Sequence, residues 1–166
     1  PSASCVGFVR NYYTKLFDNS SLHNKVKELT GRIYEFTEFL TDVVKIDNSG
    51  AELNGKATYH DSCAGLRECK IKAGPRKLLS HVKGLELVEM NDVETCCGFG
   101  GSFAVKFDAI SVAMADQKII NATATQADYI ISTDLSWLMH IDGCIKKKSS
   151  SLKTMHIADV LANGWE

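Results

Sequence analysis

From residue 56 onward, the sequence alternates short apolar runs with longer segments that have helical spacing. This alternation predicts an α/β fold with a mostly parallel sheet, because strand, crossover helix and strand are the repeating unit of such folds. The predicted strands cover residues 56–60, 85–90, 129–131 and 152–157, and the predicted helices cover residues 75–82, 108–124, 135–145 and 158–162. The helix over 108–124 is apolar on more than one face, so we expect it to be largely covered.

Residues 1–50 have a different character and are predicted to be helical. Residues 6–17 are mostly apolar and aromatic, and turn residues follow them. Apolar residues then recur at spacings of three and four from Val26 to Val43, which predicts one amphipathic helix laid on the core. Asn48-Ser49-Gly50 ends this region and Gly55 adds a further break. We therefore expect a helical segment over 1–50 and an α/β domain over 51–166, joined in one globular unit.

Composition narrows the functional classes. With 166 residues, 45% of them hydrophobic, the chain can bury a core without metal or disulfide staples. The 19 basic and 20 acidic residues nearly balance, so no charge pattern indicates binding to nucleic acid or to an anionic membrane. Because the sequence shows no signal peptide and no transmembrane stretch, its six cysteines indicate a reducing cytoplasm rather than a secreted disulfide scaffold.

Two adjacent cysteines, Cys96 and Cys97, open a glycine-rich turn. A disulfide between them would be strained, because their Cα atoms are only ~3.8 Å apart, below the usual range of ~4.4–6.8 Å. Cys63 lies 33 positions before Cys96, too far for a local zinc knuckle but suited to a site built from strand-end loops. Thiolates favour zinc, copper(I) or iron–sulfur centres, and adjacent cysteines can address different irons of a cluster more readily than they close a tetrahedral zinc site.

Three motifs together resemble a known family: His-Asp-Ser-Cys at 60–63, Cys-Cys-Gly-Phe-Gly-Gly-Ser-Phe at 96–103 and Asp-Leu-Ser-Trp-Leu-Met at 134–139. They are similar to the second cysteine-rich repeat of the CCG-domain iron–sulfur oxidoreductases, especially the members that serve lactate and glycolate oxidation. The resemblance covers essentially the whole chain. It implies the C-terminal part of a two-repeat protein, with residues 1–5 ending the first repeat and residues 6–50 connecting the two.

The family pattern has a cysteine, then a vicinal pair opening Cys-Cys-Gly, then Cys-x-x-Cys or Asp-x-x-Cys. The resemblance implies that Cys63, Cys96 and Cys97 are ligands of a [4Fe–4S]-type cluster, and that Asp134 is an oxygen ligand or a hydrogen-bond partner. Trp137 stands where the pattern has its last cysteine, and an indole cannot bind a metal because it offers only an N–H donor.

The glycines of the turn, Gly98, Gly100 and Gly101, would let the backbone approach the cluster and direct N–H donors toward its sulfurs. The resemblance further implies electron transfer between a flavin or iron–sulfur partner subunit and an acceptor, within a lactate or glycolate oxidation complex. Two alternatives stay open. Trp137 motivates a degenerate domain that binds zinc or no metal and acts as an interaction module, and the vicinal thiols are also compatible with a thiol-disulfide or sulfur-carrier enzyme.

Four further residues were weighed for a role at this site. Cys5 is an extra ligand by resemblance or a free thiol, and His60 can donate to a thiolate, bind metal or pass a proton. The simpler expectation for His60 is a strand-end histidine satisfied by the local backbone. Cys144 lies two helical turns, ~10.5 Å, beyond Trp137, so we do not expect it to replace the missing ligand. Cys69 is expected to be a semi-exposed bystander.

Overall fold

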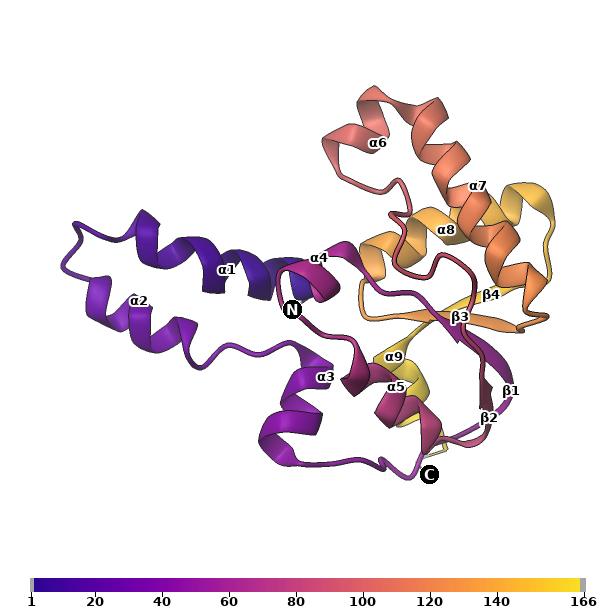
Figure 1. Ribbon diagram of the computed structural model, residues 1–166, viewed down its shortest axis with the longest axis horizontal. Helices are drawn as coiled ribbons and strands as arrows, with labels where there is room; N and C mark the ends of the chain where they lie inside the picture. Colours follow the sequence, from indigo (N-terminus) through magenta and orange to yellow (C-terminus); the bar gives the residue numbers. More distant parts are fainter. Residues whose placement is uncertain (1, 165–166) are drawn as a thin grey trace.

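Four parallel strands form the centre of the computed structural model, which describes residues 2–164 (Figure 1). The strands are β1 (Glu52–Tyr59), β2 (Lys83–Leu87), β3 (Tyr129–Ser132) and β4 (Lys153–His156), in the order β2-β1-β3-β4. Successive side chains of a strand point to opposite faces, so Ile130 and Ile131 enter two different cores. The predicted α/β class and parallel sheet are confirmed.

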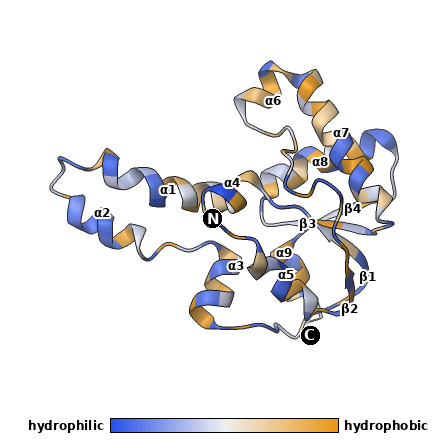
Figure 2. Cartoon of the chain, viewed as in Figure 1, coloured by the Kyte–Doolittle hydropathy of each residue, from blue (hydrophilic) through white to orange (hydrophobic). Residues whose placement is uncertain are grey.

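Helices cover both faces of the sheet. The core around Ile130 is closed by α7 (Asp108–Ala124) and α8 (Leu135–Lys148), and the core around Ile131 by α5 (Ala73–Ser80) and α9 (Ile157–Ala162). Figure 2 shows mixed apolar and polar residues along these helices, as expected for helices with one buried face. The expectation that α7 is largely covered is wrong, because Ile110 and Ile120 are each 55% exposed. Helix α8 packs along one side of α7 and leaves these residues open.

The N-terminal region forms a helical hairpin of α1 (Ala3–Leu16) and α2 (His23–Thr30) that extends from the body (Figure 1). It continues into α3 (Phe36–Glu38) and a π-helical segment, η1 (Phe39–Val44). The single amphipathic helix predicted from Val26 to Val43 is therefore wrong. Helix α2 ends at Gly31, and Glu35 and Glu38 form a capping box that starts α3.

Two short helices and one strand differ from the sequence-based expectation. Helices α4 (Cys63–Arg67) and α6 (Ser102–Lys106) were not predicted, since each is only five residues long. The expectation that Gly55 interrupts the secondary structure is wrong. Gly55 lies inside β1 with φ +139°, where the register with β2 shifts, and a glycine tolerates this backbone conformation.

The strand order reverses next to β1. From β1 the chain passes to β2 on one side, and it later returns to β3 on the other side. The carboxyl ends of β1 and β3 therefore separate two oppositely directed connections, which is where ligands bind in open α/β sheets. The loop with His60 and Cys63 follows β1, and Asp134 follows β3.

Candidate metal centre

Three thiols from two loops meet at this edge of the sheet. Cys63 begins α4 directly after β1, where Ser62 caps the helix by accepting the Gly65 N–H at 3.1 Å. Cys96 and Cys97 lie in the loop that connects β2 to α6 (Ser102–Lys106). Cys96 lies close enough to Cys63 to raise the pKa of that thiol, and both thiols contribute to the raised pKa of Cys97. All six cysteines lie in the described range and are free thiols.

The vicinal cysteines face two different cavities. Cys97 and Cys63 line a cavity of about 220 Å³ together with His60, Asp134 and Trp137. Gly100 and Ser4 also contribute to its wall. Cys96 instead lines a neighbouring cavity of about 280 Å³, between the loop and α7. The two adjacent thiols therefore open into different cavities, and Cys63 shares the cavity of Cys97.

His60 and Trp137 form a buried stack at the first cavity. Their ring centroids are 3.9 Å apart and their planes differ by 14°. Among residues 2–164, the two ring nitrogens of His60 have no hydrogen-bond partner, and the Trp137 Nε1 has none either. The expectation that the local backbone satisfies the His60 side chain is therefore wrong. Burial lowers the pKa of His60 well below its ordinary value, so the ring is neutral.

Lys118 is a buried cation that the sequence analysis missed. Its side chain is in the middle of α7, and its Nζ donates to the carbonyl oxygens of Asp92 at 2.6 Å and Val93 at 3.1 Å. Burial lowers the pKa of Lys118, and the nearby thiol of Cys97 opposes that shift. Its spacing of three and four from Ala115 and Ala122, both buried, was the available signal for a lysine on the covered face of α7.

The two thiols at the first cavity are poor nucleophiles. Burial raises the pKa of Cys97 to about 12, although the Phe99 backbone N–H, directed at its sulfur, favours the thiolate. Burial and then the adjacent Cys96 raise the pKa of Cys63. Since reactive cysteines need a lowered pKa, this environment argues against a thiol-disulfide enzyme that uses Cys97 for attack.

Asp134 is occupied as a helix cap. Its Oδ1 accepts the Ser136 hydroxyl at 2.6 Å and the Trp137 N–H at 3.3 Å, so it starts α8. Its carboxylate also borders the first cavity. The structure places Asp134 beside Cys63 and Cys97, with part of its hydrogen-bonding capacity already used.

The three glycines of the turn have different surroundings. A Cβ on Gly98 would lie 2.4 Å from the Ser111 carbonyl oxygen of α7, and Gly98 has φ +83°. Gly100 lines the first cavity, as expected for a backbone close to a bound group. Gly101 has φ +52° at the start of α6 and open space around it. Close packing on α7 therefore accounts for Gly98 without any ligand.

The remaining cysteines lie elsewhere. Cys5 is exposed on α1 and is not part of the cavity wall, although its neighbour Ser4 is. Cys69 is buried and its Sγ donates to the Ala3 carbonyl oxygen at 3.3 Å, so the expected semi-exposed bystander is wrong. Cys144 lies on the buried face of α8, where burial and then Asp116 raise its pKa, and no other thiol contributes to that shift.

The donor set fits a thiolate-bound group better than it fits a single ion. Within residues 2–164, no three His, Cys, Asp or Glu side chains converge in the way one metal ion requires. A zinc ion needs its sulfurs at about 2.3 Å, so its ligands must crowd together. A multi-iron cluster accepts thiolates that are further apart, because they bind different irons. The adjoining cavity and the unpaired nitrogens of His60 and Trp137 supply space and polar atoms for such a group.

The fold and the grouped thiols define a cysteine-rich domain protein, and residues 57–142 match the family model for the CCG cysteine-rich domain. The chain is 44% identical to lactate utilization protein A of Geobacillus sp. (strain WCH70) over 161 residues, which are 97% of this chain and 68% of the relative. It is 42% identical to lactate utilization protein A 2 of Bacillus cereus (strain Q1) over 165 residues, or 99% of this chain and 68% of the relative. The chain belongs to the lactate utilization protein A family of CCG-domain proteins.

None of the helices within residues 2–164 combines the length and the apolar character that crossing a membrane requires.

Proposed function

We propose that this chain is an iron–sulfur electron-transfer subunit of a lactate or glycolate oxidation system. The observation that carries the proposal is the meeting of Cys63 with Cys96 and Cys97 at the strand-order reversal, beside a cavity lined by unpaired polar atoms. The three thiolates would hold a [4Fe–4S]-type cluster, with Asp134 as an oxygen ligand or hydrogen-bond partner. Such a cluster would accept and release single electrons.

The surrounding residues have definite tasks in this proposal. The thiols of Cys63 and Cys97 must lose their protons on binding, so their raised pKa values make loading dependent on pH. Lys118 holds the loop before the vicinal pair and keeps a positive charge beside the thiolates. The Phe99 backbone N–H favours the Cys97 thiolate, and it would stay available to the sulfur of a bound cluster. The buried rings of Trp137 and His60 form the inner wall of the first cavity.

Anaerobic reconstitution with iron and sulfide tests this function. The wild-type protein is expected to gain iron and inorganic sulfide in stoichiometric amounts, with cluster absorbance and a paramagnetic signal after reduction. Cys96→Ser should lose most of the bound iron, because it removes one of the three thiolates proposed to hold the cluster. Cys144→Ala is the matched control, since that thiol is buried in the core away from the site, and it should load like the wild type. Equal iron content in Cys96→Ser and the wild type would rule out this location.

A second candidate is a zinc-binding or interaction module without a cluster. Trp137 favours it, because this residue occupies the position of an expected cysteine and is buried against His60. Metal analysis of protein purified without oxygen separates the two functions. Zinc or no metal in place of iron and sulfide would support the second.

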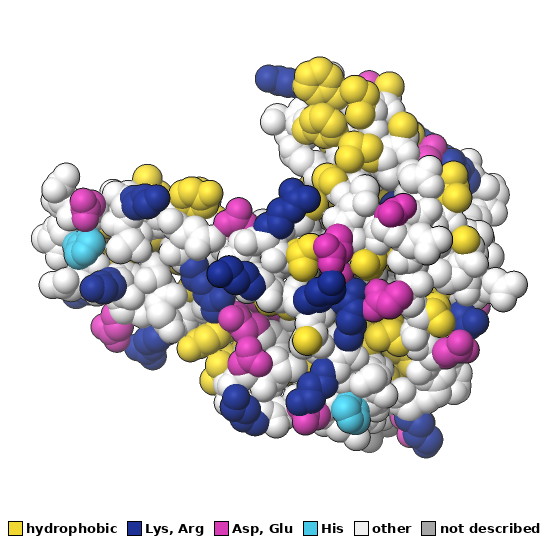
Figure 3. Space-filling model, in the orientation of Figure 1, with side chains coloured by type: hydrophobic (Ala, Val, Ile, Leu, Met, Phe, Trp, Pro, Cys, Tyr) yellow, Lys and Arg dark blue, Asp and Glu magenta, His cyan; other side chains and the backbone are white. Residues whose placement is uncertain are grey.

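We also propose that the electrons are exchanged with other proteins of the oxidation system. This rests on the names of the relatives, which are lactate utilization proteins. Exposed apolar side chains gather around helix α6. In Figure 3, this apolar patch borders a hollow that separates α6 from the α1–α2 hairpin. The substrate would then be oxidised on a partner, and co-purification under gentle conditions would identify it.

A further inference from the structure

His60 is a buried imidazole whose polar atoms are not satisfied by the protein. It is 0% exposed at the carboxyl end of β1, and both ring nitrogens lack a partner among the described residues. A buried polar atom without a hydrogen-bond partner destabilises the folded protein, and this ring carries two of them. Such a group calls for an explanation by something bound beside it.

The surroundings of His60 identify what that partner would be. Its ring lines the same cavity as Cys63 and Cys97. Imidazole nitrogen and thiolate sulfur together form the donor sets of many zinc sites, and histidine also replaces cysteine in one class of iron–sulfur centre. The ring is neutral, so one nitrogen has a free lone pair. No carboxylate pairs with this ring within residues 2–164, which leaves that lone pair for a metal.

Trp137 fixes how the imidazole is presented. The two rings lie flat against each other at 3.9 Å, so the His60 plane is held. The lone pair of an imidazole nitrogen lies in the ring plane, and the stack therefore directs it past the indole rather than into it. Trp137 removes an expected ligand and at the same time orients a neighbouring one.

We propose that one ring nitrogen of His60 binds the metal centre held by Cys63 and Cys97, in place of the thiolate that is missing at Trp137. The inference rests on the proposed function for the position of that centre. The second nitrogen keeps its N–H, and a cavity of about 220 Å³ has room for a water molecule to accept it. Cys96 lines the neighbouring cavity and would complete the set from that side.

Pulsed electron paramagnetic resonance on protein labelled with ¹⁵N-histidine tests this ligation. After reconstitution with iron and sulfide and reduction, the wild type should show the strong nitrogen coupling of one directly bound imidazole. His60→Phe keeps a ring to stack on Trp137 but removes both nitrogens, so the coupling should disappear. His140→Phe is the matched control: His140 is 5.7 Å from Phe99, ring centroid to ring centroid, and does not line this cavity, so the coupling should persist.

The other outcomes are equally decisive. A cluster without nitrogen coupling, a weak coupling typical of an N–H···S hydrogen bond, or an unchanged coupling in His60→Phe would overturn the ligation and leave the proposed function standing. If the wild type forms no cluster, the proposed function fails and a zinc titration against a chromogenic chelator decides the inference. At least tenfold weaker zinc binding by His60→Phe than by His140→Phe would support it. Equal binding, or no binding by the wild type, would overturn it.

Discussion

Gly98 ties the vicinal cysteines to helix α7. Its φ of +83° is a conformation that other residues adopt only with strain, and a Cβ there would lie 2.4 Å from the Ser111 carbonyl oxygen. The Ser111 hydroxyl also donates to the Gly98 carbonyl oxygen at 2.9 Å. A single residue thus fixes the distance between the loop that carries Cys97 and the helix that carries Lys118.

We expect Gly98→Ala to destabilise the metal-free protein by about 2–4 kcal/mol, from backbone strain and overlap with α7. Gly143→Ala is the matched control, since Gly143 is helical and exposed and a Cβ there meets nothing within 4 Å. That change should be neutral or stabilise by up to about 1 kcal/mol. Urea denaturation measures both, and an equally mild effect of the two substitutions would contradict the tight packing at Gly98.

The burial of His60 has a consequence for acid stability. Because the folded ring stays neutral, only the unfolded chain takes up this proton as the pH falls below about 6.5. The metal-free wild type therefore loses up to ~1.4 kcal/mol per pH unit from this group, relative to a variant that cannot titrate there. Denaturation of wild type and His60→Phe with a chelator present should show a difference that grows in favour of the variant from pH 7 to pH 5. A difference independent of pH would mean that His60 accepts a proton in the folded protein.

At the scale of elements, the sequence predicted the sheet well and the connections poorly. The short apolar run at 129–131 and the helix over 108–124 were predicted within a residue of β3 and α7, because burial on both sides and long helical periodicity leave a strong pattern. Helix α4 and helix α6 are too short for any periodicity to register. The apolar stripe from Val26 to Val43 misled, because Leu29 and Val43 are half exposed.

The candidate site, like the fold, was predictable from the sequence only in part. The grouping of Cys63 with Cys96 and Cys97 followed from motif and strand-end position, since the carboxyl ends of parallel strands share one edge. The flat stack of His60 on Trp137 and the reach of Lys118 to the Asp92 carbonyl depend on tertiary packing, to which a sequence gives no spacing rule. The role of Asp134 as a cap was visible in principle, because it directly precedes α8.

Helix α8 offers a way to separate capping from ligation at Asp134. Asp134→Ala should cost about 0.5–2 kcal/mol, because the Trp137 N–H loses its acceptor. Asp134→Asn keeps a good capping oxygen and removes the carboxylate charge, so its stability should stay close to that of the wild type. The iron content of Asp134→Asn after reconstitution then tests whether the carboxylate is also a ligand. Normal loading of Asp134→Asn would make the residue a cap alone, and lost loading with intact stability would make it a ligand.

The loop before the vicinal pair depends on α7 through Lys118. Lys118→Met keeps the buried stem but leaves the carbonyls of Asp92 and Val93 without their donor, so the loop should open more often. Hydrogen exchange of the backbone amides at 92–97 should speed up several-fold in this variant. Lys106→Met is the control, because Lys106 is exposed at the end of α6. Unchanged exchange at 92–97 would show that the ammonium does not hold the loop.

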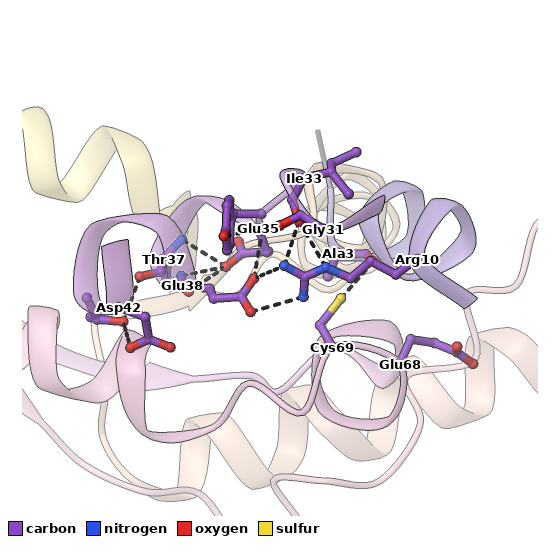
Figure 4. Close-up of polar contacts among 12 residues, drawn as sticks. Ala3, Arg10, Gly31, Ile33, Glu35, Thr37, Glu38, Asp42, Glu68 and Cys69 are labelled. Atoms are coloured by element: carbon purple, nitrogen blue, oxygen red, sulfur yellow. Dashed lines mark hydrogen bonds and ion pairs between the residues drawn. The ribbon is translucent and has the colours of Figure 1, made fainter. Parts of the chain in front are cut away.

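At the scale of the whole molecule, one arginine joins the N-terminal helices. Arg10 on α1 donates to the Ile33 carbonyl oxygen at 2.6 Å and pairs through two nitrogens with the Glu38 carboxylate (Figure 4). Cys69 of the α/β part reaches the Ala3 carbonyl oxygen at the start of α1, as the same view shows. These contacts support our proposal that residues 1–50 and 51–166 form one cooperative unit.

The Arg10→Met substitution tests whether residues 1–50 and 51–166 unfold together. Loss of a bidentate, half-buried pair and of the bond to Ile33 should destabilise the protein by about 1–3 kcal/mol, because charged partners are left unsatisfied. Arg32→Met breaks a pair to Glu28 whose side chains are 76% and 67% exposed, and it should change stability by less than about 0.5 kcal/mol. If the helices and the sheet unfold together, Arg10→Met shifts a single denaturation midpoint, read alike by far-ultraviolet circular dichroism and by Trp137 fluorescence in a Trp165→Phe background, where Trp137 is the sole tryptophan. Two separated transitions, with only the circular dichroism signal shifted, would instead show that the N-terminal helices unfold on their own while the stack of His60 on Trp137 stays intact.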